Sequence, residues 1–302
     1  MVAEMTKTKK VGLFATANAP NPEMLARGAE RFRRLTGMEL LPWKETPVGP
    51  RHFAGDDSAR AEGFNTLLDE PEMDGMVAMR GGYGSTRILE WLDFGKLRER
   101  ECFVCGYSDI TAILLAAWKH GCKRLIHGPM MQSSWGAETP PETRRLETES
   151  FLNALNGGRD LLPPWAGGKT LKPGVAEGPL VAMNLTLLDA MLGTPFCPDL
   201  TGAVLALEDI AEPAHDIDRK LNHLRQTGIL KRLGGLLFGQ FTDAKDAEFL
   251  PEIRREYAAL VNGPVVEELS FGHCHPGLAL PFGKPVRMLA TPNQRLSLKL
   301  ML

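Results

Sequence analysis

Apolar and amphipathic segments alternate through the first half of the chain. The apolar run 11–17 is followed by Asn21-Pro22, which are favoured at a helix cap and first turn, and then by apolar residues at helical spacing up to Gly37. The same pattern recurs and predicts strands at 75–80, 101–107 and 124–128 and helices at 57–68, about 85–92 and 109–120. Strands that alternate with helices predict a mostly parallel sheet that helices cover on both faces.

A stretch rich in proline and glycine, with one short helical pattern, separates this half from a second set of strands and helices. In the second half the pattern predicts strands near 174–183, 203–208, 234–241 and 264–267 and helices near 185–192 and 216–227. The chain of 302 residues is long enough for two domains. We therefore predict an α/β domain at 1–135, a linker at 136–173 and a second α/β domain at 174–302.

The composition excludes several classes of protein. The formal net charge is -2, which gives no indication of nucleic-acid binding. No run approaches the roughly 18 apolar residues of a membrane span, and the first apolar stretch ends at a turn, so we expect a cytoplasmic protein. The five cysteines are an odd number, which indicates reduced thiols. Cys102 and Cys105 form C-x-x-C, but in a strand this spacing sends them to opposite faces, so we interpret them as core residues.

Ser108 stands between a predicted strand and a predicted helix. The strand ends in Gly106-Tyr107, and the helix begins with Asp109. This is the order of a nucleophile elbow, in which a sharp turn lifts a serine hydroxyl above the sheet and the unpaired N–H groups of the helix can hold an oxyanion. Ile110 replaces the second glycine of the usual G-x-S-x-G pattern. The pattern is equally typical of a serine that caps a helix, so both interpretations stay open here.

Two other segments carry groups that could serve such a serine. The turn 80–84, RGGYG, could hold a phosphate or supply a backbone N–H to an oxyanion hole, although it lacks the lysine of a P-loop. Glu208 and Asp209 follow an apolar strand, where ligands collect in open α/β sheets, and Glu212 adds a third acid nearby. The pattern does not choose among the three carboxylates.

Two of the seven histidines, His273 and His275, lie in one loop, FGHCHP. With Cys274 between them they could bind a metal, but no third ligand has suitable spacing, so we predict neither a metal nor a cofactor. A histidine base for the serine is the better interpretation. Spacing alone does not choose between the two, but Pro276 favours a structural role for His275 in turning the chain.

Six motifs in this order resemble the LD-carboxypeptidase family, also called muramoyltetrapeptide carboxypeptidases, whose relatives include the microcin C self-immunity peptidases. The motifs are RGGYGS (80–85), GYSDITA (106–112), IHGPM (126–130), LEDI (207–210), GQFTD (239–243) and FGH…LPFG (271–283). The resemblance covers nearly the whole chain. Six motifs in the same order are more specific than any one of them.

The resemblance implies both a fold and a function. The N-terminal domain would be like class I glutamine amidotransferases, and the smaller C-terminal domain would be of the swivelling type. The site would consist of Ser108 as nucleophile, His273 as base, Glu208 as the residue that orients the base, and the backbone N–H groups of Gly81, Gly82 and Asp109 as oxyanion hole. The substrate would be a murein peptide, cut between the L-centre of a diamino acid and a terminal D-alanine. The family also suggests a homodimer.

Three further positions bear on the substrate. Arg80 is a candidate for binding the substrate carboxylate. Many family members have Gly-Gly-Asn-Leu where this chain has Ala-Met-Asn-Leu, so we expect Met183 and Asn184 to contact the substrate and Met183 to narrow its approach. His215-Asp216 replaces a Tyr-Arg pair of the family, which again concerns peptide specificity.

Three alternatives remain at this point. The same triad could cut aminoacyl-nucleotides, with Trp135 or Trp165 as an aromatic platform for a base. The chain could be a non-catalytic binding protein of the same fold, although the intact set of serine, glutamate and histidine argues against it. A metal or redox protein that uses the cysteines fits the sequence least.

Overall fold

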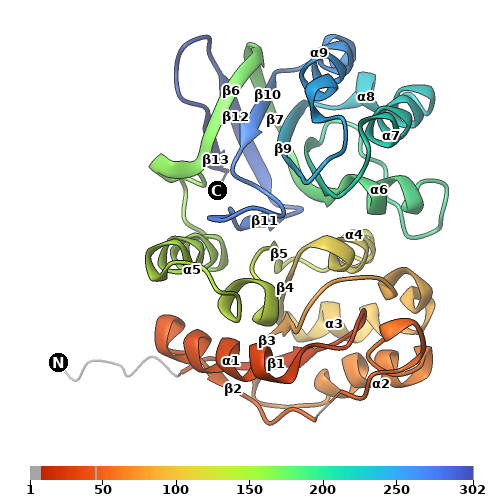
Figure 1. Cartoon of the computed structure of the whole chain (residues 1–302), viewed down its shortest axis with the longest axis vertical. Coiled ribbons are helices and arrows are strands. Elements are labelled where there is room, and N and C mark those ends of the chain that lie inside the picture. Colours follow the sequence, from red (N-terminus) through yellow and green to blue (C-terminus); the bar gives the residue numbers. More distant parts are fainter. Residues whose placement is uncertain (1–7, 45, 302) are drawn as a thin grey trace.

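The computed structural model describes residues 8–44 and 46–301. They form two α/β lobes, one above the other along the longest axis of the molecule, each built around its own sheet (Figure 1). The predicted two-domain α/β fold is therefore confirmed. No helix of these residues is both long and apolar enough to span a bilayer.

The first lobe contains β1 (Lys10–Phe14), α1 (Pro22–Thr36), β2 (Glu39–Leu40), α2 (Asp57–Leu67), β3 (Met73–Ala78), α3 (Phe94–Arg100), β4 (Phe103–Gly106), α4 (Thr111–Lys119), β5 (Leu125–His127) and α5 (Pro141–Leu155). The second lobe contains β6 (Gly167–Lys172), β7 (Gly174–Asn184), α6 (Leu185–Met191), β8 (Val204–Ile210), α7 (Ala214–Gln226), α8 (Ile229–Arg232), β9 (Gly235–Thr242), α9 (Leu250–Leu260), β10 (Val265–Leu269), β12 (Pro285–Ala290) and β13 (Ser297–Leu300). Between β10 and β12 the chain returns to the first lobe as β11 (Leu280–Phe282).

The first sheet is mostly parallel, as the alternation of strands and helices predicts, whereas the second has as many antiparallel as parallel pairings. The first has the strand order β11-β5-β4-β3-β1-β2, and β11 pairs antiparallel with β5. The second has the order β13-β12-β7-β8-β9-β10-β6, with β7 to β10 parallel and antiparallel strands at both ends. Since β11 adds to the far sheet, the loop between β10 and β11 has to cross from the second lobe to the first.

The caps of α1 follow directly from the sequence. The Asn21 side chain accepts the Met24 N–H at 3.0 Å, and Gly37 ends the helix with φ 70°. The apolar stripe at Leu25, Ala29 and Phe32 is buried. Both ends and the buried face of this helix agree with the prediction.

Two segments differ from the prediction. The residues predicted as a helix at 85–92 form two short 3-10 turns, Ser85–Arg87 and Leu89–Trp91, because Ile88 between them has non-helical angles of φ -115° and ψ 4°. The predicted linker 136–173 holds α5, where the pattern predicts a short helix, but it also holds β6, which pairs antiparallel with β10. The glycine-rich sequence of β6, GGKTLK, lacks the apolar alternation that would have predicted a strand.

The two cysteines of the C-x-x-C pattern lie on opposite faces of the first sheet. Cys102 packs in the same cluster as Val104, whereas Cys105 packs with Phe103 in a second cluster. All five cysteines are free. The pair is therefore part of the core, as predicted from the strand spacing.

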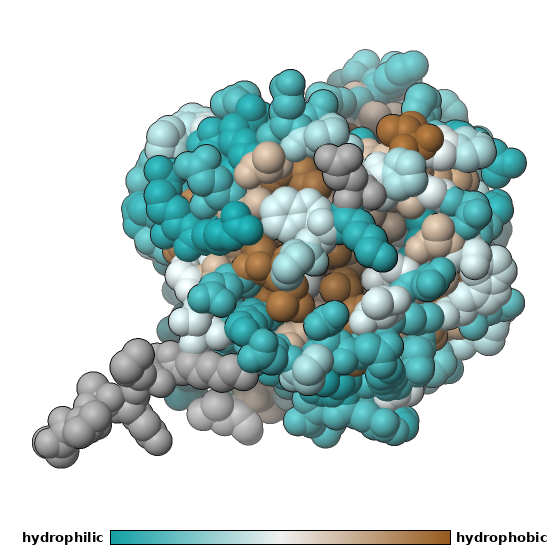
Figure 2. All heavy atoms as spheres, turned by 90° about the horizontal axis from the view of Figure 1, so that it is seen from below, coloured by the Kyte–Doolittle hydropathy of each residue, from teal (hydrophilic) through white to brown (hydrophobic). Residues whose placement is uncertain are grey.

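The end of the first lobe that points away from the second lobe is not uniformly polar. Figure 2 shows apolar side chains gathered in a hollow on this face, with hydrophilic residues around them. A cavity of about 410 Å³ opens between β1, the segment after β2 and α2, and Phe14, Trp43 and Met79 are among its lining residues. The cavity that lies against the triad described below is far smaller.

Alanine substitutions at two helical glycines should have opposite effects on stability. A Cβ at Gly28 in α1 would lie 2.2 Å from the Met131 carbonyl oxygen, whereas a Cβ at Gly63 in α2 would meet nothing within 4 Å. Gly28→Ala should lower the free energy of unfolding by about 1–3 kcal/mol, because backbone would have to move. Gly63→Ala should raise it by about 0.4–1 kcal/mol. Denaturant unfolding of both variants measures this, and a stable Gly28→Ala protein would contradict the packing of α1.

Candidate active site

Ser108 occupies a strained turn at the end of β4. Its φ is 61°, in the left-handed region that residues with a side chain rarely adopt. It begins a 3-10 turn, Ser108–Ile110, that leads into α4, and this turn has no side-chain cap. The Ser108 Oγ instead lies 3.1 Å from His273 Nε2. Of the two interpretations of this serine, the structure agrees with the elbow and not with the helix cap.

The tight turn depends on small residues around the serine. A Cβ at Gly106 would lie 2.7 Å from Ile110 Cγ2, so Gly106 lets the isoleucine pack directly against the strand end. Ile110 is fully buried. The isoleucine that breaks the usual elbow pattern therefore fills a core position against the first glycine of that pattern.

His273 links Ser108 to a buried carboxylate. His273 Nδ1 lies 2.7 Å from Glu208 Oε2, and the His273 backbone N–H donates to the same oxygen at 3.2 Å. Glu208 is 0% exposed. A carboxylate at Nδ1 fixes the imidazole so that Nε2 faces the serine hydroxyl. Ser108, His273 and Glu208 thus lie in one hydrogen-bonded row.

Backbone irregularities make room for Glu208. The pairing of β8 with β9 shifts between Leu207 and Asp209, because a bulge in β9 places Gly239 and Gln240 opposite Glu208. Gly272 has φ 99°, and a Cβ there would lie 2.5 Å from the Glu208 carboxylate. The glycine before the histidine in the FGH motif is therefore required by both its backbone angle and the space it leaves.

Of the three acids near the end of β8, Glu208 is the one that contacts His273. Asp209 is buried and accepts hydrogen bonds from the Thr186 N–H and hydroxyl, at 3.0 and 2.8 Å. Glu212 pairs with Lys220 instead. Asn184 donates through one amide nitrogen to Glu208 at 3.3 Å and to Asp209 at 2.8 Å, so it ties the two buried carboxylates together.

The turn 80–84 lies against the serine. A Cβ at Gly81 would lie 3.0 Å from Ser108 Cβ, and Gly82 has φ 123°. Among the described residues, no hydrogen bond uses the backbone N–H of Gly81, Gly82 or Asp109. The Asp109 side chain is buried and accepts the Ser85 N–H at 2.8 Å, which ties the serine turn to this glycine turn.

Comparison with known proteins identifies the family. Family models described as the LD-carboxypeptidase N-terminal and C-terminal domains match residues 11–128 and 177–288. A probable murein peptide carboxypeptidase of Bacillus subtilis is 30% identical over 94% of this chain and 90% of its own length. The chain belongs to the LD-carboxypeptidase family. The prediction of a serine carboxypeptidase of this family is thereby confirmed.

Solved structures of the family share the whole fold. The muramoyltetrapeptide carboxypeptidase from Oxalobacter formigenes has a TM-score of 0.83 and 27% identity, with 97% of this chain and 98% of that chain covered. The MccF protein in complex with glutamyl sulfamoyl guanosine has a TM-score of 0.85 at 20% identity and covers 99% of this chain and 97% of its own. At that identity the second likeness is one of fold.

Two of the residues expected to bind substrate in this LD-carboxypeptidase have buried side chains. Met183 is 0% exposed and packs in the core, so the expectation that its side chain narrows the cleft is wrong. Asn184 is also buried, and its side chain caps α6 and holds Glu208. The two alternate along β7, so one faces the core and the other the carboxylates. Arg80 is half-buried, and its guanidinium donates to the Gly81 and Ala19 carbonyl oxygens at 3.2 Å.

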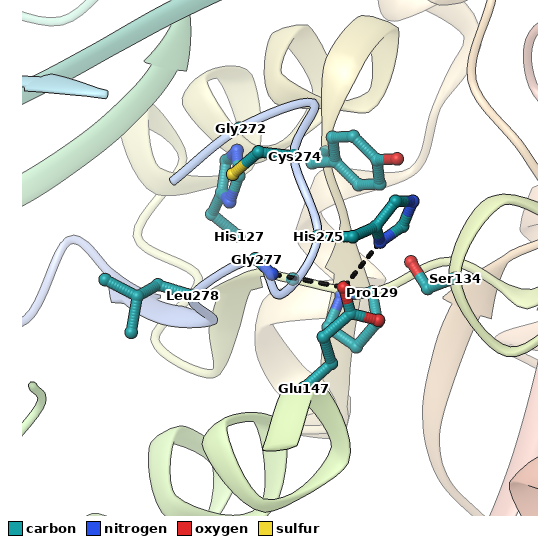
Figure 3. A pocket seen from close by; sticks show the side chains of 11 residues that line it. His127, Pro129, Ser134, Glu147, Gly272, Cys274, His275, Gly277 and Leu278 are labelled. Atoms are coloured by element: carbon teal, nitrogen blue, oxygen red, sulfur yellow. Dashed lines mark hydrogen bonds and ion pairs between the residues drawn. The ribbon is translucent and has the colours of Figure 1, made fainter. Parts of the chain in front are cut away.

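Sequence reasoning missed several residues around the base. The Tyr107 ring lies edge-on to the His273 ring, with 4.9 Å between centroids, and the Thr242 hydroxyl donates to the His273 carbonyl oxygen at 2.8 Å. Behind them, Figure 3 shows His127, Glu147 and His275 around a cavity of about 20 Å³. His127 lies in the IHGPM motif, which marked this position without indicating its role.

His127 gives the LD-carboxypeptidase a testable pH dependence. Burial, together with the nearby His273, lowers the pKa of His127 to about 3. Neither ring nitrogen has a hydrogen-bond partner among the described residues. The unfolded chain, with an ordinary histidine pKa of about 6.5, therefore binds the proton first, and stability falls as the pH drops from 6.5 toward 3.

We expect the free energy of unfolding to lose up to about 1.4 kcal/mol per pH unit through His127 between pH 6.5 and pH 5. Urea unfolding at both pH values measures this loss. His127→Leu should remove it, whereas the exposed His215→Gln should keep the wild-type slope. Equal slopes for wild type and His127→Leu would show that His127 does not titrate in this way.

Proposed function

We propose that this protein is a serine carboxypeptidase that releases the terminal D-alanine of murein tetrapeptide in cell-wall recycling. It would use the triad Ser108, Glu208 and His273 to cut the bond between the L-centre of a diamino acid and D-alanine. The observation that carries the proposal is the row of hydrogen bonds from Ser108 Oγ to His273, 3.1 Å, and from His273 to Glu208, 2.7 Å. The names of the relatives in Bacillus subtilis and Oxalobacter formigenes support the choice of substrate.

The row of residues supplies each proton transfer that peptide cleavage requires. His273 Nε2 takes the proton of the Ser108 hydroxyl as its oxygen attacks the peptide carbonyl. The imidazolium that forms is stabilised by Glu208, and it then protonates the nitrogen of the leaving D-alanine. His273 then takes a proton from the water that attacks the acyl-enzyme, and it returns this proton to Ser108 Oγ as the ester bond breaks. Glu208 needs no proton of its own, since it orients the ring and balances its charge.

The negative oxygen of the tetrahedral intermediate needs donors close to the serine. The backbone N–H groups of Gly81, Gly82 and Asp109 are suitable because they flank Ser108 and donate to no other described group. Each such donor is worth about 3–4 kcal/mol of barrier in related chemistry. Asp109 itself would contribute through its backbone, since its side chain is buried against the glycine turn.

Arg80 is our candidate for the group that binds the substrate carboxylate. It precedes the glycines of the proposed oxyanion hole, and its guanidinium is held by carbonyl oxygens of the first lobe. Partial burial lowers the pKa of Arg80, but a guanidinium remains charged at neutral pH. A fixed cation beside the nucleophile would favour substrates that end one residue beyond the cleaved bond.

An aminoacyl-nucleotide substrate is less well supported. It would need an exposed aromatic ring to stack on a base. Trp135 is 1% exposed and its ring N–H donates to Thr148, so it is not available. Trp165 is only partly buried and could still serve. The family resemblance also supports a homodimer as part of this proposal.

Substitution of Ser108 tests its role as the nucleophile. Ser108→Ala should leave a folded protein whose kcat is lower by about 10⁴–10⁶-fold, because the members of a triad act as a unit. Exposed Ser58→Ala serves as the matched control and should keep full activity. Addition of EDTA should change neither wild type nor control. Near-normal turnover in Ser108→Ala would rule out the triad.

Cleavage of defined peptides tests which bond the enzyme cuts. Incubation with murein tetrapeptide should release D-alanine, seen by mass spectrometry, and the same peptide ending in L-alanine should stay intact. Arg80→Ala should raise KM for the tetrapeptide more than it lowers kcat, since it removes a binding contact. Release of a dipeptide, or equal cleavage of both peptides, would contradict the proposed specificity.

A further inference from the structure

The loop that carries His273 is held by two carboxylates from different lobes. Glu208, on β8, binds His273 Nδ1 at 2.7 Å. Glu147, on α5, binds His275 Nδ1 at 2.6 Å (Figure 3). Glu147 also accepts the Gly277 backbone N–H at 3.1 Å through the same oxygen. The two histidines of the FGHCHP segment therefore make equivalent contacts with carboxylates of different lobes.

Helix α5 is part of the lobe that carries the nucleophile. It packs against α1, β5 and β11, and its Phe151 lies in a core cluster of the first lobe. The hydroxyl of Thr148, one residue after Glu147, accepts the Trp135 ring N–H at 3.0 Å. The Ser150 hydroxyl accepts the Ala279 N–H at 3.0 Å, which fixes the chain just before β11. Glu147 is thus attached to the same body as Ser108.

The contact between Ser108 and His273 depends on how the loop is placed between the lobes. Ser108 follows β4 of the first sheet, whereas the loop leaves β10 of the second sheet. The Thr242 hydroxyl on β9 donates to the His273 carbonyl oxygen at 2.8 Å, so the first part of the loop is held to the second lobe. Glu208 fixes the orientation of the His273 ring, but it fixes it to the second lobe.

We propose that the Glu147–His275 pair is a positioning device that holds the base loop against the first lobe, so that His273 stays within reach of Ser108. The proposal rests on the triad proposed above. Glu147 and His275 are positioning residues in it, because they act through His273 and touch neither the nucleophile nor the substrate.

The electrostatics of the cavity favour an ionic pair. Glu147 is 3% exposed, and such a buried carboxylate requires a compensating charge or donors. Burial raises the pKa of Tyr107 to about 12 and that of Cys274 to about 11 and lowers that of His127 to about 3, so these lining residues are neutral at pH 7. Hydrogen bonding to Glu147 raises the pKa of His275. Arg144, one turn earlier on α5, adds positive charge near Glu147.

The test measures acylation of Ser108 by a fluorophosphonate in the full chain, with the rate constant and the final extent of labelling recorded separately. Glu147→Ala and His275→Ala should each lower the rate constant by roughly tenfold to a hundredfold at full extent, because a small displacement of a reacting group costs that much. Glu147→Gln, which keeps an acceptor, should retain more of the rate. The double variant should be no slower than the slower single one, since both residues act through one contact.

The exposed pair of His223 and Asp189, with 2.7 Å between His223 Nδ1 and Asp189 Oδ1, gives the matched control. His223→Ala should label at the wild-type rate. With tetrapeptide, the Glu147 and His275 variants should show lower kcat at constant KM.

Wild-type rate constants in Glu147→Ala and His275→Ala would overturn the positioning role. A lower extent of labelling at an unchanged rate constant would also overturn it, because that result indicates only a loss of folded protein. If wild type fails to label at Ser108, or if His273→Ala labels as fast as wild type, the triad itself is wrong and not merely the pair behind it.

Discussion

The hydrogen bond between Ser108 and His273 joins two side chains that are 165 residues apart and stand on different lobes. Several irregular features of the backbone lie beside it. The serine is held at a positive φ, which costs about 1–3 kcal/mol and persists only where packing enforces it. Here the enforcement comes from Ile110 packed on Gly106 and from Asp109 bonded to the neighbouring turn. This strain lies at the point where the hydroxyl has to leave the sheet.

The position of His273 in this bond depends on buried carboxylates. Glu208 receives the His273 ring, the His273 backbone N–H and the Asn184 amide, so its charge is held by donors and not by a permanent cation. Such an anion is balanced best when the ring becomes imidazolium during the reaction. Asp209 next to it is held by other donors from α6. Adjacent carboxylates in one strand therefore have separate tasks, one at the base and one in the scaffold.

Local features of the fold and site were predictable because short-range physics decides them. Asn21 and Gly37 bound α1, and the spacing of Cys102 and Cys105 places them on opposite faces of a strand. The choice between an elbow and a cap at Ser108 was not predictable, because it depends on His273, which is distant in the chain. The burial of Met183 was missed because strand alternation does not say which face is the core.

The contacts that sequence patterns could not reveal are those made where the chain returns to an earlier element. Strand β11 joins the first sheet from the far end of the sequence, with Leu280 beside His127. This return brings the FGHCHP loop between the lobes and places His275 against Glu147, a residue of the segment that reads as a linker. A proline-rich segment between two domains need not be passive, since α5 carries a buried charge on its inner face. Because the chain crosses to the first lobe at this loop, His273 lies next to Ser108 and His275 lies next to Glu147 on α5.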